Sequence, residues 1–348
     1  MSLILTQQFV KRLFFPYNKA TLMMKFKKTK SFLQWLKKVS LKYKKMIILF
    51  FIFWGLWAFG LGALGGWFLS RAGLDKFPDL TKDDRLLILA PHIDDEVISS
   101  AGLIQEANRV GAIVKIVYLT NGDENLSSLI GKEKIITLNP NDFVALGEQR
   151  MDEGKKSTKI LGLKETDLIF LGFPDRGLNH LLTKFFNENT PYSSQGTKFE
   201  YNPYQGTYKE NQIYTGSNVV ADLTEILSSF KPTLIIAPHP RDKNDDHAAT
   251  FQFLQKVLSE QKINTHLFAY LTHYPLFPPQ KKLQPHQFLY PPKKLFTQKG
   301  WFSFDLTQEQ ENKKLEAVNQ NKSQLKLAPV YDLLQSFVKQ NEIFEEID

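Results

Sequence analysis

The stretch that decides the fold is Arg85 to Ala101, RLLILAPHIDDEVISSA. Residues 86–90 are an apolar run that Pro91 ends, a pattern typical of a strand buried on both faces of a parallel sheet. After a polar turn, a helical spacing of apolar residues resumes at Val97. We therefore predict a strand, a turn and a helix, with the turn at the carboxyl end of the strand, where parallel α/β sheets bind ligands. The turn concentrates four ionisable side chains: His92, Asp94, Asp95 and Glu96.

A second stretch of the chain repeats this order. Residues 233–237, TLIIA, predict another buried strand, and residues 238–247, PHPRDKNDDH, form a second polar turn before a helical pattern. One aspartate in each turn can cap the following helix, but the histidines and the other carboxylates then need another explanation. Because both turns lie at the same edge of the predicted sheet, we interpret them together as a metal site.

The pair PHIDDE and PHPRDKNDDH resembles the PIG-L/LmbE family of zinc-dependent N-acetylglucosamine deacetylases. The first motif of that family reads Pro-His-Pro-Asp-Asp-Glu, and its second ends Asp-x-His-x-Asp-His. The resemblance extends from about Arg85 to the C-terminus. It implies a Rossmann-like, mostly parallel α/β sheet flanked by helices. It also implies that His92, Asp95 and His247 are zinc ligands and that Asp94 is the general base.

The resemblance places three further residues at the substrate. Arg150, in LGEQRMDEGKKSTKILGL, is similar in position to the substrate-binding arginine of the family, and Asp175 ends a turn, LGFPD, similar to one that lines the sugar site. Asn244 stands where the family usually has a histidine that assists the leaving group, and an amide there can donate a hydrogen bond to the oxyanion. The chain also departs from the family at Ile93, which replaces a proline.

The proton donor has to be another residue, because an amide does not titrate in the useful range. His239 lies in the same turn as His247, and His273 lies just beyond the strand expected at residues 267–271. Both histidines are therefore expected at the ligand-binding edge of the sheet. We predict His239 as the proton donor or as a contact to the oxyanion, with His273 as the second candidate.

The composition limits the classes of function. The 348 residues include no cysteine, so disulfides are excluded and any zinc is held by histidine and carboxylate. The net charge of +8 is uneven: residues 1–45 contain 12 lysines or arginines and no acid, and the rest contains 32 basic and 36 acidic residues. A basic segment beside a mildly acidic body indicates an anionic membrane surface as partner and argues against nucleic acid.

The next segment is apolar enough to span a membrane. Residues 46–69, MIILFFIFWGLWAFGLGALGGWFL, contain no charged residue, and a helix of this length, about 36 Å, crosses a bilayer. We expect an uncleaved transmembrane signal anchor here, followed by a linker at residues 70–84 and a deacetylase domain at residues 85–348. The positive-inside rule places residues 1–45 in the cytoplasm and the domain outside it. This orientation predicts a single-pass protein of a bacterial cell membrane that acts on the cell envelope.

The remaining elements follow from apolar spacing. Strands are expected at residues 113–119, 167–171 and 267–271, and helices at residues 143–161, 217–230, 308–325 and 330–344. Residues 176–216 are expected to be a long loop that covers the substrate or packs against itself. Asp123 and Glu124, which follow the strand at residues 113–119, are expected to be solvated loop residues.

The sequence thus predicts a membrane-anchored hydrolase that uses Zn²⁺ to remove acetyl from an N-acetylglucosamine-type amino sugar of an envelope glycolipid or glycan. Two alternatives stay open. A metal-dependent glycosyltransferase would leave His92 and His247 unused, because Mg²⁺ and Mn²⁺ prefer oxygen ligands. A catalytically inactive glycan-binding relative is suggested by Asn244. The expected partners are the acetylated sugar and the lipid bilayer, and not nucleic acid.

Overall fold

The chain divides into two compact units, residues 1–71 and residues 72–348. The computed structural model describes residues 49–50, 52–55, 74–125, 138–187, 189–296, 300–326 and 328–347. The predicted basic segment and most of the predicted membrane span, residues 46–69, lie outside the described residues. Residues 49–50 and 52–55 of that span are helical. Among the described residues, no helix combines the length and the apolar character needed to cross a bilayer.

The second unit is built around a sheet whose eight strands, counted within the described residues, have the order β1-β7-β8-β6-β5-β2-β3-β4. Five neighbouring pairs are parallel, and β8 runs antiparallel to both β6 and β7. The sheet of this α/β fold is therefore mixed, with parallel pairing predominant as predicted. The strands are β1 (Asp75–Lys76), β2 (Arg85–Ala90), β3 (Ile113–Thr120), β4 (Leu168–Phe173), β5 (Leu234–Pro238), β6 (His266–Tyr270), β7 (Trp301–Asp305) and β8 (Asn341–Glu346).

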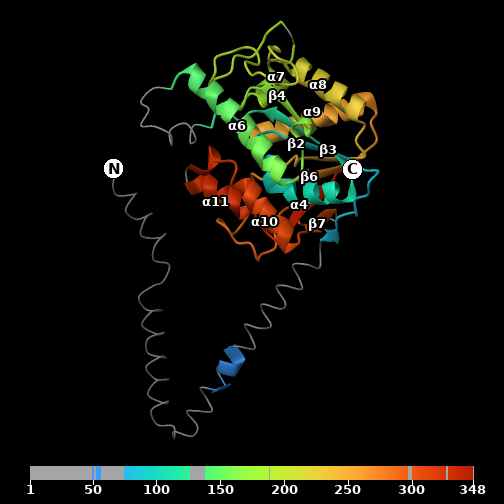
Figure 1. Cartoon of the computed structure of the whole chain (residues 1–348), viewed down its shortest axis with the longest axis vertical. Coiled ribbons are helices and arrows are strands. Elements are labelled where there is room, and N and C mark those ends of the chain that lie inside the picture. Colours follow the sequence, from blue (N-terminus) through green and yellow to red (C-terminus); the bar gives the residue numbers. More distant parts are fainter. Residues whose placement is uncertain are drawn as a thin grey trace, which may run out of the picture. The chain divides into compact units, whose positions relative to one another are not determined.

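Helices cover both faces of this sheet (Figure 1). The side chains of β2 alternate between the two faces, so that Leu86 and Ile88 join one apolar core and Leu87 and Leu89 join the other. The first core is closed by α4 (Asp95–Val110), α6 (Pro140–Ile160), α10 (Gln308–Val318) and α11 (Ala328–Ser336), and the second by α7 (Leu178–Thr183), α8 (Gly216–Phe230) and α9 (Asp245–Gln261). Two short 3-10 helices, η1 (Glu165–Asp167) and η2 (Gln324–Lys326), connect these elements. The strand–turn–helix prediction for Arg85 to Ala101 is confirmed.

The largest difference from the prediction concerns residues 330–344, expected as one helix. The structure divides them between α11 and β8. Ile343 and Phe344 of β8 are 3% and 0% exposed, because the strand lies between β6 and β7. Pairing on both edges and burial of these side chains override the helical spacing of the sequence. The helix expected at residues 308–325 ends at Val318, the loop at residues 176–216 contains α7, and β1 and β7 were not predicted.

Helix α4 is tied to β8 by a buried carboxylate that also forms an ion pair with α10. The helix has a non-helical residue, Ser100, with φ −138° and ψ 16°. Just after it, the N–H groups of Gly102 and Leu103 donate to the carboxylate of Glu342 at 2.8 and 3.0 Å. Lys314 Nζ of α10 donates to the same carboxylate at 2.8 Å, and both charged side chains are about 1% exposed. Glu342 therefore joins β8, α4 and α10 at one point.

Replacing Glu342 by alanine should strongly destabilise this unit. It would leave the Lys314 charge and two N–H groups buried without partners, which costs about 3–5 kcal/mol of the free energy of unfolding. Urea unfolding of the full chain, followed by far-UV circular dichroism, measures this change. Glu346→Ala in the same strand is the control, since its carboxylate is partly exposed, with 39% of the side-chain surface accessible. Equal unfolding midpoints for the two variants would contradict the assignment.

Candidate active site

The turn between β2 and α4 is held in a constrained shape by its own side chains. The His92 N–H donates to Asp95 Oδ2 at 3.0 Å, and the Asp94 N–H donates to Glu96 Oε2 at 3.0 Å. Asp94 has φ 128°, a value that residues with a side chain rarely adopt and that costs about 1–3 kcal/mol. Burial raises the pKa of Glu96 to about 8. Hydrogen bonds within the turn therefore hold it in a strained shape, as is common at functional sites.

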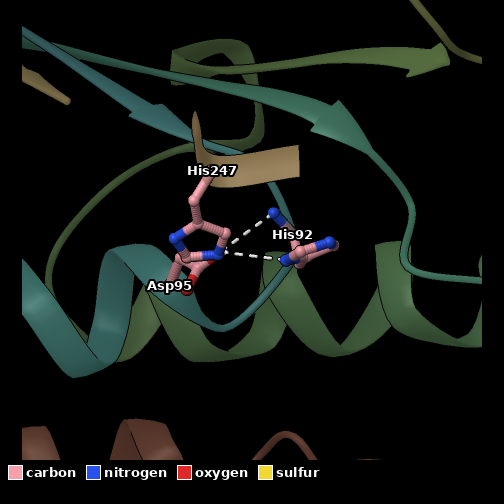
Figure 2. Close-up of side chains that lie close together, drawn as sticks. All are labelled: His92, Asp95 and His247. Carbon is pink, nitrogen blue, oxygen red and sulfur yellow. Dashed lines mark hydrogen bonds and ion pairs between the residues drawn. The ribbon is translucent and has the colours of Figure 1, made fainter. Parts of the chain in front are cut away.

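Three predicted metal ligands converge at this turn. Asp95 Oδ2 lies 3.3 Å from His92 Nδ1 and 3.1 Å from His247 Nε2 at the start of α9. Figure 2 shows the three side chains pointing toward one another. His247 Nε2 is buried and faces the Asp95 carboxylate, so once it is deprotonated its lone pair can bind a cation together with that carboxylate. Two imidazoles and one carboxylate fit a divalent metal and leave a coordination position for water or substrate.

The second ring nitrogen of His92 faces carboxylates from two other loops. Nε2 lies 3.3 Å from Asp175 Oδ1 and 3.4 Å from Asp246 Oδ2. Asp246 also accepts the N–H groups of Arg176 at 2.6 Å and Leu178 at 3.0 Å, which fixes the loop after β4 against α9. Burial lowers the pKa of His92, but hydrogen bonds to Asp175 and Asp246 outweigh it and raise this pKa well above its ordinary value.

His247 has the same arrangement. Its Nδ1 lies 3.2 Å from Thr272 Oγ1 and 3.4 Å from Asp242 Oδ2. Burial lowers the pKa of His247, but Asp95 and Asp242 outweigh it and raise the pKa to about 9. Each histidine thus presents one nitrogen to the centre and the other to a carboxylate, an arrangement that orients metal-binding imidazoles. Because a ligating imidazole nitrogen must be unprotonated, metal binding here has to displace protons.

The predicted base, Asp94, is held by Arg150. Arg150 Nη2 lies 3.2 Å from Asp94 Oδ2 and also donates to the carbonyl of Ile93, and Nη1 donates to the carbonyl of Gly122 at 2.8 Å. Burial raises the pKa of Asp94 to about 7, although the Arg150 charge opposes this rise. Arg150 is 3% exposed, so its guanidinium serves mainly to position the base and the two loops.

These groups open into a cavity of about 210 Å³. The apolar part of its lining consists of Ile98, Val330, Leu333 and Leu334. The polar part consists of His92, Asp94, Asp95, Asn125, Arg150, Asp175, Arg176, Asn244, Thr272, His273 and Gln324. A larger open groove of about 740 Å³ lies beside α9, but Lys256 is the one charged residue in its lining. The smaller cavity is therefore where chemistry can occur.

Comparison with known families agrees with this geometry. Residues 87–258 match the family model PIG-L, described as GlcNAc-PI de-N-acetylase. This segment is therefore similar to the PIG-L family. The match supports a metal-dependent N-deacetylase, a hydrolase of amide C–N bonds, as the sequence predicted.

Solved structures with a related chain trace include both deacetylases and a hydratase. N,N'-diacetylchitobiose deacetylase from Pyrococcus horikoshii is 18% identical over 76% of this chain and 85% of its own, with a TM-score of 0.47. The teicoplanin deacetylase Orf2 is 18% identical over 75% and 97%, with a TM-score of 0.48. The 4-carboxy-2-hydroxymuconate hydratase GalB from Pseudomonas putida is 12% identical over 76% and 95%, with a TM-score of 0.47. Likeness at this level does not determine a reaction.

The structure places His239 outside the lining of this cavity. The His239 side chain is 1% exposed, its Nε2 pairs with Glu345, and its ring stacks on Trp301 at 5.7 Å between centroids. Its Nδ1 accepts the Arg241 N–H at 2.9 Å. Both nitrogens are therefore occupied within the fold, and the expectation that His239 donates the proton is corrected. This pair could not be predicted, because Glu345 belongs to β8, which was expected to be helical.

His273 and Asn244 do line the cavity. Burial lowers the pKa of His273 to about 4, and the neighbouring His247 contributes to the decrease. His273 is therefore neutral near pH 7 and offers a hydrogen bond rather than a titrating proton. Asn244 is the N-cap of α9, with its side-chain oxygen accepting the Asp246 N–H at 2.9 Å, so its NH₂ group is left for the cavity.

Asp123 and Glu124 are not solvated, contrary to the prediction. They are 2% and 5% exposed. The Glu124 carboxylate accepts from the Ser194 hydroxyl at 2.9 Å and the Gly196 N–H at 2.6 Å, and its own N–H donates to Asp175 Oδ2 at 2.9 Å. Asp123 accepts from the Tyr204 hydroxyl, so both acids hold the long segment after α7 against the site.

Other residues of the site were missed by sequence reasoning. Asp242 stands at the first aspartate of the motif Asp-x-His-x-Asp-His, but no role was assigned to it from the sequence. Val330, Leu333 and Leu334 had the spacing of ordinary core residues, so only the structure shows that α11 forms a wall of the cavity.

Ligands and base should be separable by metal analysis. His92→Ala, Asp95→Ala or His247→Ala should each lose bound metal and activity together, because each removes one of three protein ligands. Asp94→Asn should keep the metal and lower kcat by about 10² to 10⁴, because it removes only proton transfer. Atomic emission on gel-filtered protein, paired with turnover, measures both. Loss of metal in Asp94→Asn together with retention in Asp95→Asn would show that the two roles are exchanged.

Proposed function

We propose that this protein uses Zn²⁺ to hydrolyse the acetamido group of an N-acetylglucosamine-type amino sugar on a cell-envelope glycolipid or glycan. The observation that carries the proposal is the convergence of His92, Asp95 and His247 beside Asp94 in one small cavity. At about 210 Å³, the cavity is below the usual range for ligand sites, about 300–1,000 Å³, and so suits a single terminal sugar rather than an extended glycan.

The donor set supports zinc over the harder divalent ions. Two imidazoles with one carboxylate are typical of hydrolytic zinc sites, whereas Mg²⁺ and Mn²⁺ prefer oxygen ligands throughout. When bound here, Zn²⁺ would supply a water of lowered pKa and polarise the amide carbonyl. The same donor set argues against a glycosyltransferase.

The residues around the cavity can carry the proton transfers. Asp94 takes a proton from the attacking water, whose oxygen adds to the acetyl carbon. A pKa near neutrality lets the same carboxyl return the proton to the sugar nitrogen as the C–N bond breaks, which gives acetate and a free amine. Arg150 keeps the carboxylate aimed at the cavity throughout.

His273 and Asn244 are placed to stabilise charge rather than to transfer a proton. Both line the cavity, Asn244 with an NH₂ group that the helix cap does not use and His273 with its Nε2, since its Nδ1 lies 3.0 Å from Thr272 Oγ1. A neutral imidazole or an amide can donate a hydrogen bond to the oxyanion that develops on the acetyl group, and such donors act strongly in a water-poor site. We therefore assign the oxyanion contact to His273, with Asn244 beside it.

Acetate release tests the proposal. Purified full chain, incubated with isolated envelope fractions, should release acetate and expose new amines. His273→Ala should lower kcat about 10² to 10³-fold with unchanged zinc content, as expected for loss of one oxyanion donor. The matched control is His266→Ala in β6, whose side chain is 76% exposed. Binding to these fractions without acetate release would instead support the inactive glycan-binding alternative.

We further propose that the domain lies outside the cytoplasm, on a single-pass protein of a bacterial cell membrane. The proposal is supported by the twelve basic residues that precede the uncharged stretch 46–69. Protease added to spheroplasts should therefore digest residues 72–348 without lysis. Complete protection until lysis would place the domain in the cytoplasm.

A further inference from the structure

A loop beside the cavity exposes a leucine that the fold does not bury. Leu276 is 91% exposed and has φ +61°, a left-handed conformation unusual for a residue with a side chain. The loop is nevertheless anchored, because the next residue, Phe277, is 3% exposed and packs its ring 5.8 Å from that of Phe337. The packing of Phe277 therefore fixes the loop with the Leu276 side chain in solvent.

The same loop is joined to the helix that forms the apolar wall of the cavity. The Lys282 N–H donates to the carbonyl of Asp332 in α11 at 3.0 Å. Val330 and Leu333 of α11 line the cavity, whereas Tyr331 between them is 37% exposed. Residues 275–283 and Tyr331, here called the rim, therefore belong to the elements that bound the catalytic cavity. The loop follows His273, which itself lines that cavity.

The charge of this region is opposite to that of the rest of the domain. Residues 271–296 contain four lysines and no acid, whereas residues 46–348 as a whole carry 32 basic and 36 acidic residues. Within the rim, Lys281 and Lys282 are exposed next to Leu283 at 37% exposure, and Lys281 Nζ donates to the Phe277 carbonyl at 2.9 Å, which keeps its charge beside Leu276. A basic surface with protruding apolar side chains is typical of segments that insert into anionic lipid.

We propose that the rim rests on an anionic lipid bilayer, with Leu276 inserted among the lipids and the lysines against the headgroups. The inference deepens the proposed function, on which it rests, since it assigns the cavity to amino sugars carried by lipid at the membrane surface. Single apolar side chains flanked by lysines suit a fluid lipid surface, whereas a protein partner would need a continuous groove or an open strand edge.

The absence of cysteine permits a direct test. Leu276→Cys in the full chain, labelled with an environment-sensitive fluorophore, is reconstituted into vesicles with about 30% anionic lipid. Its emission should shift to the blue, and a lipid-borne quencher should quench it about threefold more strongly than the same label at Ser259→Cys, an exposed position on α9. Lys281→Glu with Lys282→Glu should abolish this difference. In vesicles of neutral lipid alone, the difference should also be lost.

The proposal would be overturned by equal quenching of the labels at the two positions, or by equal quenching of the Leu276→Cys label in anionic and neutral vesicles. A blue shift that grows with the protein-to-lipid ratio would identify a second copy of the chain as the occupant and would overturn it as well. None of these readings depends on turnover. Failure of this inference is therefore distinguishable from failure of the deacetylase assignment, which acetate release measures.

Discussion

The parallel pairing of β2 with β5 is the constraint on which the site depends. Leu86, Leu87 and Ile88 are in register with Leu234, Ile235 and Ile236. The two polar turns therefore leave the sheet side by side, which brings residues from positions 92 and 247 to one centre. Neither turn could bring these residues together by its local structure alone, because the ionisable groups of each turn need partners from the other.

Neighbouring charged and polar groups offset the free-energy cost of burying these ionisable side chains. Charged groups removed from water are tolerated when they are paired or hydrogen-bonded. Behind the two histidines, Asp175, Asp242 and Asp246 accept backbone N–H groups as well as facing imidazoles. The Arg150 guanidinium likewise pairs with the Asp94 carboxylate. The carboxylates thus organise loops from four strands and tune the histidines at the same time.

The sequence was informative where structure follows from local pattern and uninformative where it follows from tertiary pairing. The buried runs of β2 and β5 and the ligands beside them could be read directly, because apolar runs, prolines and clustered acids are local signals. The family resemblance added the roles. The strand β8 could not be read, since NEIFEE fits a helix equally well and becomes a strand only between β6 and β7. The error at His239 has the same origin, because its partner Glu345 lies in that strand.

The late position of β8 has a consequence for biosynthesis. Glu342 caps the interrupted part of α4 across 240 residues of sequence, and β8 fills the gap between two strands that precede it. Contacts so distant along the chain carry a large loop-closure entropy and form slowly. The ribosome must therefore have released residues 341–346 before the sheet can close around them. Until then, the helix that carries Asp95 lacks its support, and the nascent chain presents two unpaired strand edges to chaperones.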